Sequence, residues 1–133
     1  MRDGFVKVAA ATLNTKVADV EHNKWEIFRL IDETIENGAK IVVFPELCIT
    51  GYTCGDLFSQ DILLSQSAKA LEEIAAYTTG KDGLFFVGLP YVVCNKLYNV
   101  AAAVCDGEVI GMVTKTFLPN YSEFYEMRQF QRS

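Results

Sequence analysis

The sequence is poor in several residue types that common functional sites need. It has one histidine, His22, and four cysteines, none in a Cys-x-x-Cys pair, so no metal site is expected. The twelve basic residues form no dense run and the net charge is −5, which argues against nucleic-acid binding. No apolar run approaches the roughly 20 residues of a membrane-spanning helix, and residues 1–3 lead into no signal-peptide core. These absences predict a cytoplasmic protein with reduced thiols and no membrane partner.

What is present predicts one α/β domain over residues 1–133. Half of the residues are apolar and 22% are charged, which supports a hydrophobic core. Residues 6–13 are small, apolar and β-permissive and predict a first strand. Asp19 then caps a helix with apolar residues at helical spacing, which Gly38 ends. A strand at 41–44 follows, so these elements form a βαβ unit whose strands are parallel.

The second part of the chain predicts a helix followed by a β-meander. The helix is expected over residues 61–79, with Leu64, Ala68, Leu71 and Ala75 on its buried face and Glu72-Glu73 in solvent. Strands are expected at 84–93, 97–105 and 109–115. Asp106-Gly107 between two apolar runs indicates a hairpin, and a second hairpin turning at Asn95-Lys96 would pair Cys94 with Leu97.

Two opposite charges stand at the ends of predicted strands. Glu46 follows Pro45, which cannot donate to a sheet ladder, at the carboxyl end of a buried strand. Lys115 ends the last strand. A carboxylate facing a lysine across a cleft can take a proton from a nucleophile while the lysine stabilises an oxyanion. Spacing alone leaves open a structural ion pair or two unrelated surface charges.

Two separated motifs resemble those of the nitrilase, or carbon–nitrogen hydrolase, superfamily. They are Phe44-Pro45-Glu46 and the run from Lys115 to Phe130, which contains Leu118-Pro119, Tyr121, Glu123-Phe124, Glu126 and Arg128. The run 45–58, Pro-Glu-Leu-Cys-Ile-Thr-Gly-Tyr-Thr-Cys-Gly-Asp-Leu-Phe, is similar to the glutaminase domains of glutamine-dependent NAD synthetases. The resemblance implies a four-layer α-β-β-α sandwich, of which this chain supplies roughly the first half, with the first strands of both central sheets.

The resemblance also implies roles for individual residues. Glu46 matches the general base and Lys115 the oxyanion-stabilising lysine of a Glu–Lys–Cys triad. Glu126 matches a supporting glutamate, and Tyr121 and Tyr52 fall where substrate-pocket tyrosines are found. The implied chemistry is thiolate attack on the side-chain amide of glutamine, release of ammonia and hydrolysis of a glutamyl thioester. Ammonia would pass to a synthetase domain that amidates deamido-NAD; ATP and Mg belong to that domain, so no cofactor is expected in this chain.

The cysteines depart from the family pattern. The family's nucleophile follows the second motif by several dozen residues, and this chain ends at Ser133. Cys48 lies two residues after Glu46, but that position is not the nucleophile in the family, so we expect Cys48 to pack in the core. The chain is therefore expected to lack a synthetase domain, to be inactive alone and, with unpaired sheet surface, to associate as a homo-oligomer.

Three other functions stay open. The chain could belong to another nitrilase-type amidase that acts on a small amide. It could also be a non-catalytic module that uses the same fold for assembly. A redox-active thiol protein is the weakest alternative, because no cysteine stands in a motif with the neighbouring cation that would lower its pKa.

Overall fold

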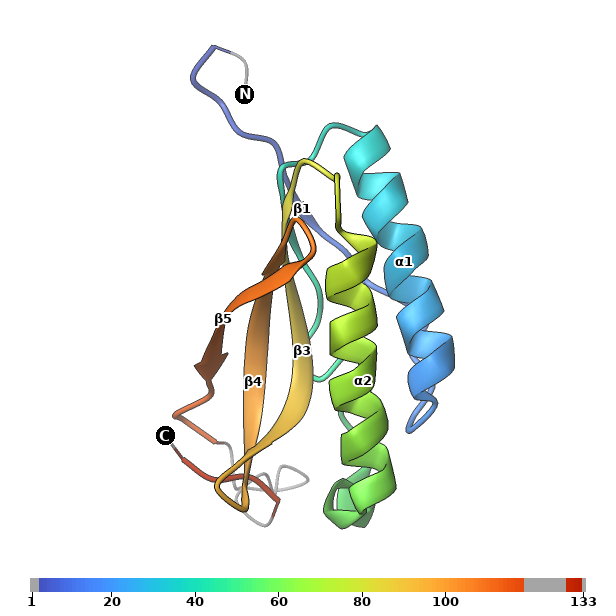
Figure 1. Cartoon of the computed structure of the whole chain (residues 1–133), viewed down its shortest axis with the longest axis vertical. Helices are drawn as coiled ribbons and strands as arrows, with labels where there is room; N and C mark the ends of the chain where they lie inside the picture. Colours follow the sequence, from blue (N-terminus) through green and yellow to red (C-terminus); the bar gives the residue numbers. More distant parts are fainter. Residues whose placement is uncertain (1–2, 119–128, 133) are drawn as a thin grey trace.

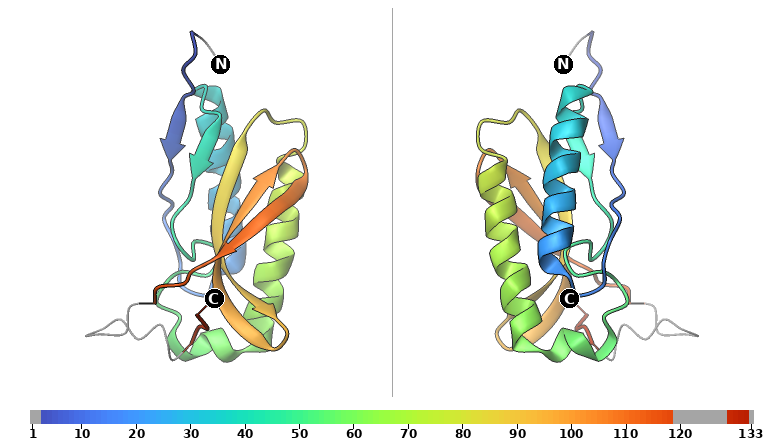
Figure 2. Two further views of the ribbon diagram at one scale, coloured as in Figure 1. Left: turned by 90° about the vertical axis from the view of Figure 1, so that its left-hand side faces the viewer. Right: turned by 90° about the vertical axis from the view of Figure 1, so that its right-hand side faces the viewer.

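The computed structural model describes residues 3–118 and 129–132. Within them, five strands form one sheet in the order β1-β2-β3-β4-β5, and two long helices lie side by side on one face of it (Figure 1, Figure 2). The strands are β1 (Val8–Ala10), β2 (Ile41–Val43), β3 (Leu84–Val93), β4 (Lys96–Cys105) and β5 (Glu108–Thr114). The helices are α1 (Val20–Glu36), α2 (Asp61–Tyr77) and the short 3-10 helix η1 (Gly55–Ser59).

The βαβ unit forms as predicted. β1 pairs with β2 and β2 with β3, both in parallel. The Asp19 carboxylate accepts a hydrogen bond from the backbone N–H of His22 (3.1 Å) and so caps α1. Gly38 follows the helix with a φ of +85°, which its missing Cβ permits. β1 is shorter than the predicted 6–13 strand because it is an edge strand whose one neighbour, β2, offers three residues for pairing.

The β-meander also forms, but its first turn lies one residue earlier than predicted. Both hairpins are antiparallel with two-residue turns, at Cys94-Asn95 and at Asp106-Gly107. All four turn residues have positive φ, as a type I′ turn requires. The predicted pairing of Cys94 with Leu97 is therefore wrong, because Cys94 lies in the turn and Val93 pairs with Lys96.

The buried face of α2 is centred about one residue away from the predicted face. Its buried residues are Leu63, Ser67, Ala70, Leu71, Ile74 and Ala75, whereas Leu64 and Ala68 are half-buried. Glu72 is exposed as expected, but Glu73 forms an ion pair with the buried Lys24 of α1 (2.5 Å). Burial alone would lower the pKa of Lys24, but hydrogen bonds to Glu73 and Glu21 raise it overall. This contact links the two helices.

The two faces of the sheet differ because α1 and α2 cover only one of them (Figure 1, Figure 2). Val42, Phe85 and Val104 point toward the helices and are fully buried in the core. All described strands belong to one sheet, so the expectation that the chain holds strands of both central sheets is wrong for this part of the chain. The physical reason is the two-residue turns, which keep β4 bonded to β3 and β5 bonded to β4. The meander therefore widens the first sheet instead of starting a second.

Candidate active site

The loop that carries Glu46 lies directly on β3. The N–H of Phe44 donates to the carbonyl of Phe86 (2.9 Å), and the parallel ladder stops at Pro45. The loop then crosses Gly88, where an added Cβ would stand 2.4 Å from the backbone nitrogen of Leu47. Glycine is needed at position 88 because any side chain would push the Glu46 loop off the sheet.

Buried hydrogen bonds from Asn23 of α1 also hold the loop that carries Glu46. Asn23 of α1 is fully buried, and its amide donates to the carbonyls of Lys16 (2.8 Å) and Ile49 (3.0 Å). Its side-chain oxygen accepts from the N–H of Lys16 (2.8 Å). The N–H of Ile49 donates to the carbonyl of Gly88 (3.1 Å). The backbone beside Glu46 is thus held by both a helix and a strand.

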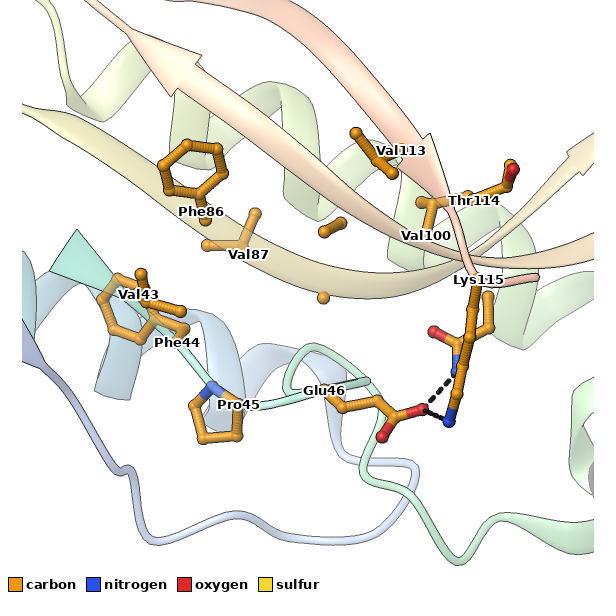
Figure 3. Close-up of a pocket in the computed structure, with 13 residues that line it drawn as sticks. Val43, Phe44, Pro45, Glu46, Phe86, Val87, Val100, Val113, Thr114 and Lys115 are labelled. Atoms are coloured by element: carbon orange, nitrogen blue, oxygen red, sulfur yellow. Dashed lines mark hydrogen bonds and ion pairs between the residues drawn. The ribbon is translucent and has the colours of Figure 1, made fainter. Parts of the chain in front are cut away.

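Lys115 meets Glu46 across the end of the sheet. Its backbone N–H donates to the carbonyl of Asn99 (2.8 Å), one step beyond the β4–β5 ladder. Its Nζ lies 2.7 Å from Oε1 of Glu46, and the Asn99 amide donates to the same oxygen at 2.6 Å (Figure 3). The structure therefore brings together the two charges predicted from the strand ends. The Glu46 side chain is 42% exposed and that of Lys115 30%, so solvent reaches the pair.

A cavity of about 380 Å³ opens beside the pair. Its walls come from the ends of β2 and β5 and the middle of β3 and β4, with apolar residues such as Val43, Phe86 and Val113 on one side (Figure 3). Glu46 and Lys115 are the charged residues among the described residues that line it. A concave site with apolar walls and a few convergent polar groups suits a small organic molecule.

Among the described residues, no cysteine lines this cavity. Cys48 is buried, with its thiol 3.6 Å from the carbonyl of Gly88, and burial raises the pKa of that thiol to about 12. Burial also raises the pKa of Cys54, whose thiol lies 3.2 Å from the carbonyl of Thr50. Both thiols are protonated at neutral pH and are poor nucleophiles, as the packing role predicted for Cys48 requires. Cys94 is exposed and Cys105 partly buried, and all four are free.

Of the other predicted site residues, the structure describes Tyr52 alone. Tyr52 is half-buried against the core and is not among the described residues that line the cavity. Tyr121 and Glu126 lie outside the described residues. No cluster of three or more His, Cys, Asp or Glu side chains that could hold a metal ion occurs in the described ranges. The described helices include none long and apolar enough to cross a membrane.

Sequence reasoning missed two residues of the site. Asn99 is a polar residue that directly precedes the apolar run Val100–Val104 within β4. Gly88 interrupts the largely apolar strand β3. A polar side chain or a glycine inside a buried strand is a usable signal, because each normally weakens a strand unless a close contact requires it.

The sequence and the fold match a known family of enzymes. The model of the carbon-nitrogen hydrolase family matches residues 7–131, and the chain belongs to this family. Its nitrilase-type fold is the four-layer α-β-β-α sandwich expected from the sequence, of which the described residues form one sheet and one helical layer. An amidase from a Nesterenkonia species, 20% identical, shares the fold with a TM-score of 0.81, and the chain covers 50% of it.

Particular relatives agree with the resemblance to NAD synthetases. The glutamine-dependent NAD(+) synthetase of Aquifex aeolicus is 42% identical over 128 residues, and that of Mycobacterium tuberculosis is 36% identical over 126. The crystal structure of the Cytophaga hutchinsonii enzyme of the same name is 35% identical, with a TM-score of 0.90 over 96% of this chain. The chain spans about a fifth of the length of these curated relatives.

Proposed function

We propose that this chain forms the base-and-lysine part of the glutamine-hydrolysing site of a glutamine-dependent NAD synthetase. The observation that carries the proposal is the contact of 2.7 Å between Lys115 and Glu46 at the mouth of an apolar cavity. The similarity to NAD synthetases supports the choice of glutamine as the substrate. A separate synthetase domain would use the ammonia to amidate deamido-NAD, with ATP and Mg bound there and no cofactor bound by this chain.

The geometry suits acyl transfer from an amide. Glu46 takes the proton of a cysteine thiol, and the thiolate forms a bond to the side-chain amide carbon of glutamine. Lys115 donates to the oxygen that becomes negative in the tetrahedral intermediate. The C–N bond then breaks, and the nitrogen leaves as ammonia after taking the proton back from Glu46. Water, deprotonated by Glu46, attacks the thioester, which releases glutamate and the free thiol.

The nucleophile in this proposal is a cysteine other than Cys48 and Cys54. Both of these thiols are buried with a raised pKa, and neither lines the cavity. We therefore propose that the attacking thiol belongs to a cysteine outside residues 1–133 and that this chain alone does not turn over glutamine. In the same proposal Glu126 supports Glu46 and Tyr121 contacts the substrate, whereas Tyr52 lies outside the described lining of the cavity.

A second candidate is an amidase that acts on a small aliphatic amide. The observation in its favour is the apolar wall formed by Val43, Phe86 and Val113, which offers no charged partner for the amino acid end of glutamine. The base and the lysine would have the same roles. Rates with glutamine and with butyramide distinguish the two candidates, because a glutaminase should prefer glutamine by a large factor in kcat/KM. A non-catalytic assembly module would turn over neither amide.

The test is ammonia release from glutamine by the full-length protein that carries this chain. We expect turnover in the wild type, a loss of at least about 100-fold in Glu46→Gln, since a general base contributes about 10²–10⁴-fold, and a comparable loss in Lys115→Met. Cys48→Ala is the matched control and should keep its rate. Full activity in folded Glu46→Gln, or loss of activity in folded Cys48→Ala, would contradict the proposal.

A further inference from the structure

Asn99 is a buried amide in the middle of the sheet that the mechanism above does not use. On β4, Asn99 lies on the same face as Ala101 and Ala103, which is the side of the sheet away from the helices. It is 3% exposed. Leaving a buried amide without a hydrogen-bond partner is destabilising, so the position of Asn99 implies a specific partner.

That partner is the proposed general base. The amide nitrogen of Asn99 donates to Oε1 of Glu46 at 2.6 Å, a short bond of the kind made to a charged acceptor. The backbone carbonyl of Asn99 accepts from the N–H of Lys115 at 2.8 Å. One residue thus contacts both members of the pair, the base through its side chain and the lysine through its backbone.

The two donors to Glu46 differ in how firmly they are held. Asn99 has a short side chain on a central strand with a neighbour on each side. Lys115 has a long flexible side chain that is 30% exposed, and in the proposed reaction its ammonium group must also donate to the oxyanion. Both donors bind Oε1, so a carboxylate that lost the lysine bond would still be held through Asn99.

We propose that Asn99 is a positioning residue that keeps the Glu46 carboxylate in place while Lys115 turns to the substrate oxygen. This inference rests on the proposed function, because it assumes that Glu46 is the base. The hydrogen bond from Asn99 to Oε1 leaves Oε2 as the oxygen that takes the thiol proton. Among the described residues lining the cavity, Lys115 is the other charged group that faces Glu46.

The experiment compares Asn99→Asp and Asn99→Ser with the wild type in the full-length protein. Asn99→Asp keeps the shape but replaces the donor with an acceptor, and Asn99→Ser is too short to reach Glu46. We expect both to lower kcat for glutamine by about 10- to 100-fold, as outer-shell partners do elsewhere, with little change in KM.

Thr78→Val is the matched control for lost stability. Thr78 is fully buried and its hydroxyl contacts the carbonyl of Ala75 and the N–H of Gly107, but it does not line the cavity. It should lower Tm and leave kcat unchanged. The inference is overturned if both Asn99 variants fold and keep kcat, or if Thr78→Val lowers kcat equally. A wild-type protein that releases no ammonia would instead overturn the proposed function itself.

Discussion

Both faces of the sheet carry apolar residues, but these residues lie in different environments. Val42 points toward the helices and is fully buried, whereas Val43, its neighbour in sequence, points the other way and is 49% exposed. The same contrast separates Val87, fully buried on β3, from Val113, 72% exposed on β5. The helix-covered face is completed by α1 and α2, while the open face carries the cavity that Glu46 and Lys115 line (Figure 3).

This contrast shows that one face of the sheet stabilises the fold and the other face carries the candidate site. Burial of apolar area on the helix side drives folding. The open side keeps apolar surface that the four-layer sandwich of the family covers with a second sheet, and in this chain it lines the site. Three predictions test this separation.

The largest effect is expected where the Glu46 loop lies on the open face. Gly88→Ala places a Cβ 2.4 Å from the backbone nitrogen of Leu47 and should destabilise the chain by about 3 kcal/mol, at the upper end for overpacking. Gly111→Ala is the control, since a Cβ there meets nothing within 4 Å, and it should stay within about 0.5 kcal/mol of the wild type. Urea denaturation measures both. Equal effects in the two variants would contradict the described path of the loop.

A smaller effect should separate the two faces directly. In the 133-residue chain, Val87→Ala removes two buried carbon atoms and should cost about 2 kcal/mol of unfolding free energy. Val113→Ala makes the same chemical change on the open face and should cost less than about 0.5 kcal/mol. If Val113→Ala costs as much as Val87→Ala, another copy of the chain already covers the open face.

A third effect, confined to alkaline pH, concerns the buried thiol of Cys48. Its pKa rises from an ordinary value of 9.0 to about 12, so between these values the folded state holds a proton that the unfolded state has lost. Stability should therefore fall as pH rises from about 9 to about 12 and should not change through this group below that range. Cys48→Ala should reduce the slope of stability against pH, whereas Cys94→Ala, at an exposed turn, should leave it unchanged. Identical slopes in all three proteins would refute the burial of Cys48.

Much of this fold could be predicted from local sequence signals. The Asp19 cap, the glycine after each helix and Asp106-Gly107 locate the elements, and the βαβ order predicts parallel strands. The buried stripe of α2 lies one residue from its predicted position, because alanines and serines between its leucines make the apolar face broad and its centre ambiguous. The turn at Cys94-Asn95 also differs by one residue from the predicted turn, since neither residue is glycine.

The site was only partly predictable, for a different reason. Glu46 and Lys115 could be selected because each follows an apolar strand, yet their contact joins residues 69 positions apart. The contact of Asn99 with Glu46 spans 53 positions and depends on the register of β4 against β3, which no local signal reports. Membership of one sheet rather than two likewise depends on how the hairpins pair. Local chemistry therefore predicted the charged residues, and only the tertiary structure revealed the amide that contacts them.

The most direct test is to locate the thiol that attacks the substrate. A diazoketone analogue of glutamine alkylates the nucleophilic cysteine of a glutaminase, and peptide mass spectrometry then identifies the modified residue. In the full-length protein, we predict modification of a cysteine other than Cys48, Cys54, Cys94 and Cys105, at a rate that falls sharply in Glu46→Gln. Modification of Cys48, or an unchanged rate in Glu46→Gln, would contradict the claim that Glu46 and Lys115 serve a nucleophile from outside residues 1–133.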